Sequence, residues 1–276
     1  MNHPSPYDPA GPDLAAADEP DAPAWASPGL AGPDLAPRAG YGSPGRSTLA
    51  RYRRQREGEL AAWARSVPWR AAAAVGAGML AAVVAQAAGL HRQLLLVGLT
   101  AGAVVGWRLH FRPSAGALAW RDGARGEHAT ARMLRRLHRD GYACFHDLAV
   151  PGGEAGGGHL LIGPAGVLLV ASKRCGGRIT QTPDGRVWHD GEPLDGPLRA
   201  LRLRAAATGR ALGVRVRPLL CVHGARVSFA GITAADVRIL PAGRLRRVLR
   251  GGGQRLSQAD VAALVAHALT VLRPAG

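Results

Sequence analysis

Two long apolar runs stand out in the pattern of hydrophobic and polar positions. Residues 71–90 are apolar except for Gln86, and a second apolar run covers 94–107. Twenty helical residues span about 30 Å, which is the thickness of a bilayer's hydrocarbon core. We therefore expect a two-helix transmembrane hairpin over 71–111, with Arg108 reaching back to the headgroups. A buried Ala-rich core helix is the alternative interpretation of the first run.

The pattern after residue 120 changes to shorter elements. Ala131, Leu134 and Leu137 recur at helical spacing, and apolar runs at 159–162 and 167–172 flank a Gly-Pro-Ala-Gly turn typical of a β-hairpin. Later segments alternate between strand and helix: we expect helices over 197–212, 241–250 and 258–272, and strands over 214–223 and 237–240. The sequence predicts one α/β (α+β) sheet domain over 121–274.

The segments before the apolar runs differ sharply in composition. Residues 1–50 are rich in Pro, Ala and acids, which predicts a disordered tail. The tail contains AGPDLA twice, either as a docking motif for an unknown protein partner or as low-complexity drift. Residues 51–70 are rich in Arg and form a basic juxtamembrane segment. Because Arg also follows the second run, we expect a cell-membrane protein with its N-terminus and C-terminal domain in the cytoplasm.

Charge and cysteine content narrow the function classes. The 276 residues carry 35 Lys and Arg against 19 Asp and Glu, a formal net charge of +16. Only three Cys occur, without CxxC spacing, which excludes a disulfide scaffold and a Cys-built zinc site. The basic excess suits nucleic acid, anionic lipid headgroups or a positive-inside topology. In the helix expected over 241–250, phosphate or lipid contacts are expected from Arg244, Arg246, Arg247 and Arg250.

A series of short motifs carries a family resemblance. In chain order these are GARGE at 123–127, GY with HDL at 141–148, HLLIGPAGV at 159–167, SK at 172–173, and GRI with Trp188. They resemble the nuclease-related domain (NERD) family, which is similar to the PD-(D/E)xK nuclease fold, a restriction-endonuclease-like sheet. The resemblance is strong over about residues 122–190, and the HLLIGPAGV stretch is its most specific piece.

The resemblance implies a Mg²⁺ site that this chain matches only in part. The family pattern places a Glu on the first helix, an Asp before the His-Leu pair, and an acid two residues before a Lys. Glu127 and Lys173 match as catalytic positions. Gly158 and Ala171, however, stand where the family has acids. With the two acids missing, no metal ligand set and no cofactor is expected from the pattern.

The hairpin geometry relates the two positions that lack an acid. Gly158 and Ala171 are equidistant from the turn between Pro164 and Ala165, so they are expected to face each other across the strands. Lys173, the chain's single Lys, lies on the same strand face as Ala171. It either remains from a nuclease site or forms a structural ion pair with Glu127. Glu154, in the preceding Gly-rich loop, is the candidate substitute acid, and Asp147 lies on the strand before it.

Two functions follow as expectations. The first is a membrane-anchored, catalytically degenerate nuclease-like module that binds or scaffolds, with nucleic acid as the candidate partner and without enzyme activity. The alternatives are an active Mg²⁺-dependent nuclease that uses a shifted acid such as Glu154, and an adaptor for anionic lipid surfaces.

Overall fold

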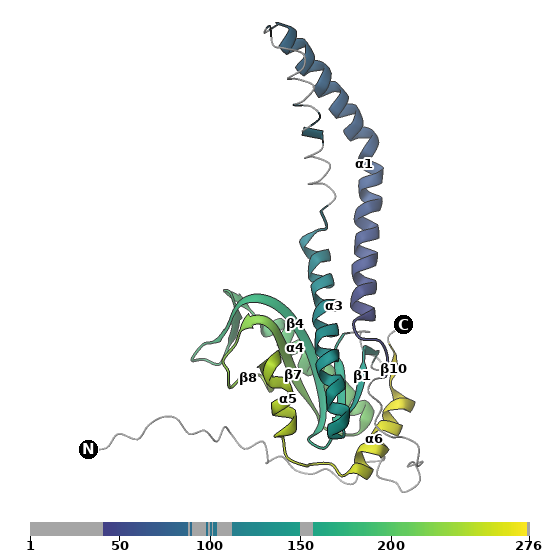
Figure 1. The fold of residues 1–276 in the computed structure, drawn as a ribbon, viewed down its shortest axis with the longest axis vertical. Helices are drawn as coiled ribbons and strands as arrows, with labels where there is room; N and C mark the ends of the chain where they lie inside the picture. The colour runs from purple at the N-terminus through teal and green to yellow at the C-terminus, as the bar shows by residue number, and fades with distance from the viewer. Residues whose placement is uncertain are drawn as a thin grey trace, which may run out of the picture.

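The structure is a computed structural model that describes residues 41–87, 89, 98, 100, 102–103, 112–149 and 157–274. A sheet covered by helices lies at one end, and a long helix extends away from it (Figure 1). The helices are α1 (Arg46–Ala87), α3 (Ala115–Leu134), the 3-10 helix η2 (Arg135–Asp140), α4 (Asp195–Leu212), α5 (Ala242–Arg250) and α6 (Gln258–Val271).

The centre of the described fold is a mixed eight-stranded sheet. Its main path runs β1-β3-β4-β7-β9-β8, and β5 and β6 continue from β4. The strands of this sheet are β1 (Ala143–His146), β3 (His159–Gly163), β4 (Gly166–Gln181), β5 (Val187–His189), β6 (Glu192–Pro193), β7 (Val216–Arg226), β8 (Ile232–Ala234) and β9 (Val237–Pro241). β4, β7 and β9 are parallel, whereas the neighbouring pairs are antiparallel. A small second sheet joins β2 (Leu148–Ala149) to β10 (Arg273–Pro274).

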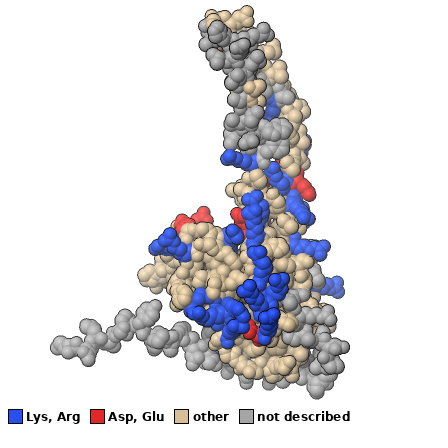
Figure 2. All heavy atoms as spheres, in the orientation of Figure 1, with Lys and Arg blue, Asp and Glu red and all other residues tan. Residues whose placement is uncertain are grey.

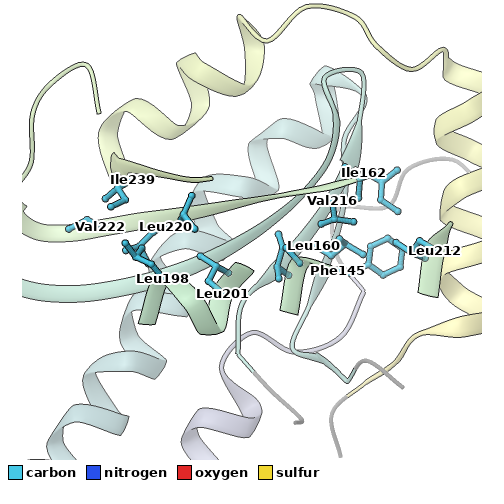
Figure 3. Packing of buried hydrophobic residues seen from close by; sticks show 14 of the residues in the cluster. Phe145, Leu160, Ile162, Leu198, Leu201, Leu212, Val216, Leu220, Val222 and Ile239 are labelled. Atoms are coloured by element: carbon cyan, nitrogen blue, oxygen red, sulfur yellow. The ribbon is translucent and has the colours of Figure 1, made fainter. Parts of the chain in front are cut away.

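Helices cover both faces of the sheet. Side chains from α4 and α6, such as Leu201 and Leu264, join one buried cluster, part of which Figure 3 shows with Leu160 and Leu220 of the sheet. Leu134 from α3 and Leu245 from α5 join a second cluster on the opposite face. Two-sided cover explains why β4 begins with a continuous buried run instead of an alternating one. The predicted mixed α/β sheet domain is thus confirmed.

The first helix corrects the predicted end of the tail. α1 begins at Arg46 and runs without a break to Ala87, so the segments predicted as tail and juxtamembrane linker share one helix. Tyr41 forms two backbone hydrogen bonds with β1. Its N–H donates to the Cys144 carbonyl, and its carbonyl accepts from the His146 N–H. Residues 41–50 therefore belong to the ordered fold. The tail prediction for residues 1–40 lies outside the described residues.

The membrane prediction is wrong for the part of the chain that the structure describes. None of its helices combines the length and the apolar character that a membrane crossing requires. Ala and Gly fill most positions of the apolar end of α1, and such small side chains add little apolar surface. The hairpin over 71–111 is not supported, and most of its second run lies outside the described residues. The cell-membrane localisation built on it is overturned.

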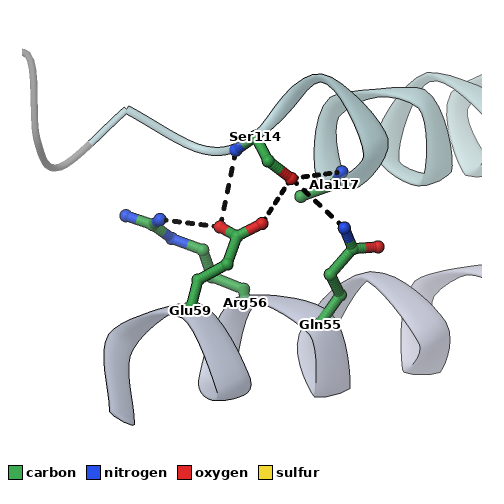
Figure 4. Close-up of polar contacts among 5 residues, drawn as sticks. All are labelled: Gln55, Arg56, Glu59, Ser114 and Ala117. Atoms are coloured by element: carbon green, nitrogen blue, oxygen red, sulfur yellow. Dashed lines mark hydrogen bonds and ion pairs between the residues drawn. The ribbon is translucent and has the colours of Figure 1, made fainter. Parts of the chain in front are cut away.

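α1 is attached to the start of α3 by a polar cluster near residue 114. Ser114 is the N-cap of α3, and its hydroxyl accepts the Ala117 N–H at 3.1 Å. The same hydroxyl donates to Glu59 of α1, while Gln55 Nε2 donates to it at 3.2 Å (Figure 4). Further along, the Arg51 guanidinium lies 5.1 Å from the Trp120 ring centroid. These contacts hold α1 beside α3 as both approach the sheet.

Candidate functional site

The β3–β4 hairpin has the register that the sequence predicts. His159 pairs with Val170, and Gly163 pairs with Gly166 across the turn. Gly158 precedes the ladder on the same side, and a Cβ added there would lie 3.8 Å from the Ala171 Cα. The two positions therefore face each other, and neither side chain carries an oxygen. A pair of facing carboxylates, which could clasp a divalent cation, is absent at these two positions.

The backbone at Gly158 has a conformation that suits glycine. Its φ is +107°, which L side chains rarely adopt, and an added Cβ would lie 3.0 Å from the Val170 carbonyl oxygen. Gly157 also has a positive φ, of +73°, and its added Cβ would meet Glu127 Oε1 at 3.0 Å. Both glycines therefore adopt backbone conformations that would strain a residue with a side chain.

Glu127 lies inside the fold, as its place on the inward stripe of α3 predicts. Its side chain is 6% exposed, and its Oε1 accepts a hydrogen bond from the Thr48 hydroxyl at 2.7 Å. Among the described residues, its Oε2 is buried without a hydrogen-bond partner. Burial raises the pKa of this carboxyl, nearby Asp147 adds to the rise, and the Thr48 hydrogen bond opposes it. The retained acid is a desolvated carboxyl held by α1.

Asp147 provides a second buried acid close to Glu127. It is 2% exposed, and its carboxylate accepts the Ser47 N–H and hydroxyl, both at 2.5 Å, and the Gly157 N–H at 2.9 Å. The Ser47 N–H belongs to the first turn of α1, where a helix has unpaired donors and favours negative charge. Asp147 therefore serves as an anchor for the beginning of α1.

The sequence reasoning missed the contribution of Ser47 and Thr48. Both residues fell inside the predicted tail, yet both are buried and bind the two acids. The one local signal is a Gly-Arg-Ser-Thr segment directly before a long helical stretch, since Ser and Thr are common where helices begin. That signal could have located the start of α1. It does not reveal partners that are far away in the sequence.

Two histidines next to the acids form a buried pair. Nδ1 of His146 lies 2.8 Å from Nδ1 of His159, so one ring donates and the other accepts. Burial lowers the pKa of His159 to about 3, with the neighbouring His146 as a further cause, and burial also lowers the pKa of His146. Both rings are therefore neutral at pH 7. Their hydrogen bond joins the end of β1 to the beginning of β3.

Lys173 is separated from Glu127 by the sheet. Gly126 of α3 contacts the strand at Ser172 and Arg174, where an added Cβ would lie 3.7 and 3.3 Å from their Cβ atoms. Because side chains alternate along a strand, Lys173 points to the opposite face, as Ala171 does. Among the described residues, no ion pair joins Lys173 to Glu127. On the α3 side of the sheet, the Ser172 hydroxyl donates a hydrogen bond to the Thr130 hydroxyl. The Thr130 hydroxyl in turn lies 2.7 Å from Nε2 of His223.

The remaining predicted site residues are Glu154 and four arginines of α5. Glu154 lies outside the described residues. On α5, Arg250 forms two hydrogen bonds to Asp140, at 2.7 and 2.8 Å, and the Arg244 guanidinium lies 3.9 Å from the Phe229 ring centroid. Arg247 is exposed, whereas Arg246 is half-buried. Two of the four arginines expected to contact phosphate thus already have protein partners.

The described residues do not fit the Mg²⁺ site that the family pattern implies. Gly158 and Ala171 offer no side-chain oxygen, Glu127 binds Thr48, and Asp147 binds Ser47. Within the described ranges, no group of three or more His, Cys, Asp or Glu residues is placed to hold a metal ion. A hard cation needs several oxygen ligands at short distance. We therefore derive no metal-dependent step from this geometry.

Comparison with known proteins agrees with the motifs. Residues 122–227 match the family model of the nuclease-related domain, NERD. The match covers α3, the β3–β4 hairpin, α4 and β7, and so it contains Glu127, the Gly158–Ala171 pair and Lys173. Searches of the curated proteins and of the solved structures found no match. Residues 122–227 of this chain are a nuclease-related domain.

Proposed function

We propose that this nuclease-related domain is catalytically degenerate and binds nucleic acid without cleaving it. The observation that carries the proposal is the facing pair Gly158 and Ala171, which has no carboxylate where the family pattern has two. The engagement of Glu127 by Thr48 supports it, because the retained acid is buried and already bonded. The alternative, a Mg²⁺-dependent nuclease that uses a shifted acid such as Glu154, becomes an outcome of the test.

The proposed nucleic-acid surface is formed by the outer sides of α3 and α5. Figure 2 shows Lys and Arg gathered over these two helices on one face of the domain. The exposed arginines of α3, η2 and α5 include Arg125, Arg132, Arg135, Arg136 and Arg247. A surface of this kind neutralises backbone phosphates and binds with little sequence preference. Aromatic side chains for base stacking are few in this domain, which favours backbone contacts.

The test uses the full chain and a fluorescent DNA duplex. We expect binding that weakens steeply as salt increases, and no cleavage when Mg²⁺ or Mn²⁺ is added. Arg132→Ala and Arg247→Ala should each weaken binding. Arg178→Ala removes the same single charge on the outer part of β4 and should affect binding less. Mg²⁺-dependent cleavage that Glu127→Ala abolishes would instead establish the nuclease. Binding to anionic vesicles but not to DNA would also contradict the proposal.

A further inference from the structure

A large cavity lies at the end of the sheet where β7 begins. Its volume is about 980 Å³, and its walls come from the first half of β7, the second half of α4, the end of α5 and the β8–β9 turn. The size matches cavities that hold small-molecule ligands. Most of its lining lies on elements that also build the sheet core, which makes the cavity a part of the fold and not a gap between mobile loops.

The cavity is strongly basic. One acid, Asp236, is found among its described lining residues, together with six arginines. These are Arg202, Arg210, Arg215, Arg217, Arg238 and Arg255. Among the described residues, none of the six forms an ion pair with Asp or Glu. Such a concentration of guanidinium groups without carboxylates creates a positive potential that an anionic ligand would compensate.

Arg217 shows that the positive charges are crowded. Its guanidinium donates to the Ala165 carbonyl, which fixes it at the cavity wall. Burial lowers the pKa of this guanidinium, and neighbouring Arg255, Arg215 and Arg238 lower it further through like-charge repulsion. All four arginines line the same cavity. A bound anion would relieve the repulsion among them.

The rest of the cavity wall is apolar. Leu168 and Leu219 contribute from the sheet, Val216 and Pro218 from the start of β7, and Val248 from α5. An inorganic anion would leave these surfaces in contact with water. A ligand with a flat apolar body as well as negative charges would cover both kinds of wall. The lining thus separates into a charged part and an apolar part.

The cavity is independent of the degenerate nuclease site. Glu127, Asp147, Gly158 and Lys173 do not line it. Leu168 reaches it from the beginning of β4, and Lys173 lies five positions further along the same strand, a separation of about 16 Å at the usual rise. Ligand binding in the cavity therefore requires neither the missing carboxylates nor a metal.

We propose that this cavity binds a nucleoside polyphosphate. The arginines would hold the phosphates, because a planar guanidinium matches two phosphate oxygens at once. The base and ribose would lie against the wall formed by Val216, Pro218 and Val248. The nucleic-acid backbone proposed for the α3–α5 surface would lie on an outer face of the domain, whereas the nucleotide would lie in the cavity. The two proposals can therefore fail separately.

Isothermal titration of the full chain with ATP, inorganic triphosphate and adenosine tests the proposal. We expect ATP to bind best, triphosphate more weakly and adenosine most weakly. Arg215→Ala and Arg255→Ala, both at exposed positions, should each weaken ATP binding about tenfold. Arg226→Ala is the matched control, since it removes the same charge at the far end of β7, ten positions and about 30 Å from Val216. Far-UV circular dichroism verifies that each variant folds.

Several results would overturn the proposal. Absence of ATP binding at about 1 mM, which corresponds to a weak interaction of about 4 kcal/mol, would do so. Equal ATP affinity of the wild type and a folded Arg215→Ala, Arg255→Ala double variant would show that the cavity is not the site. Triphosphate binding as tightly as ATP would reduce the cavity to an anion site. Displacement of ATP by a short single-stranded oligonucleotide of higher affinity would assign the cavity to nucleic acid instead.

Discussion

At the scale of single residues, the retained acid Glu127 and the neighbouring acid Asp147 both have partners within the chain. Glu127 and Asp147 are both buried, and each accepts hydrogen bonds from the first turn of α1. Thr48 engages one oxygen of Glu127, and Ser47 and Gly157 engage the carboxylate of Asp147. The titration behaviour of Glu127 should show its burial.

Glu127→Gln tests the burial of the retained acid. Because the folded pKa of Glu127 is raised, its ionisation opposes folding, and the cost begins as pH rises above the unfolded pKa of about 4.3. The Gln variant lacks this cost, so its stability relative to the wild type should be higher at pH 7 than at pH 4. Urea unfolding at both pH values measures it, with exposed Glu192→Gln as control. An unchanged difference between the two pH values would show that Glu127 is solvated.

The pair formed by His146 and His159 predicts the opposite pH dependence. A His whose folded pKa is depressed to about 3 contributes stability above its ordinary pKa of 6.5, and that stability is lost as pH falls through this window. Each pH unit between these limits should cost about 1.4 kcal/mol for His159. His159→Gln should flatten the loss in urea unfolding between pH 7 and pH 4, whereas exposed His138→Gln should not. A loss between pH 7 and pH 4 that is as large in His159→Gln as in the wild type would contradict the prediction.

At the scale of elements, the β3–β4 hairpin carries the most informative change. Its register places positions 158 and 171 opposite each other, but the backbone before β3 has a positive φ at Gly158. A carboxylate at this position therefore requires a different path of the chain as well as a different residue. Restoring the acids one by one should not restore a metal site.

Gly158→Asp is expected to destabilise the fold by about 1–3 kcal/mol, through its φ and the contact with the Val170 carbonyl. Gly185→Asp is the matched control, because its φ is +84° but no atom lies within 4 Å of the added Cβ. Urea unfolding should show the larger loss at position 158. Gly158→Asp combined with Ala171→Asp should show no Mg²⁺ binding by calorimetry. A stable double variant that binds Mg²⁺ would show that the backbone still accommodates the family's site.

The parts of the fold that could be predicted from the sequence are those determined by residues close together in the chain. Gly163, Pro164, Ala165 and Gly166 determine the hairpin turn, and Ser257 forms a capping box with Asp260, so hairpin register and helix start follow from local chemistry. The bonds from Thr48 to Glu127 and from Ser47 to Asp147 join residues far apart in sequence, and no local pattern encodes them. The membrane prediction also rested on a local pattern, and no described helix is long and apolar enough to cross a membrane.

At the scale of the whole molecule, the segment before α1 and the first turn of α1 complete the domain. Tyr41 stacks on Phe145 with ring centroids 4.6 Å apart, and Ser47 and Thr48 supply partners for the buried acids. The family match begins at residue 122, well after these residues. The nuclease-related domain of this chain is therefore completed by a segment that lies outside the residues matched by the family model.

A chain that begins at residue 113 should be less stable than the full chain for this reason. It loses the stacking on Phe145 and leaves Glu127 and Asp147 without their hydroxyl donors, and hydrogen bonds to charged groups contribute about 1.5–3 kcal/mol each. We expect a loss of about 3 kcal/mol or more in urea unfolding. The full chain with Ser47→Ala and Thr48→Val serves as the comparison, because it removes the hydroxyl bonds and keeps the backbone. Equal midpoints for the short and full chains would show that the domain folds without α1.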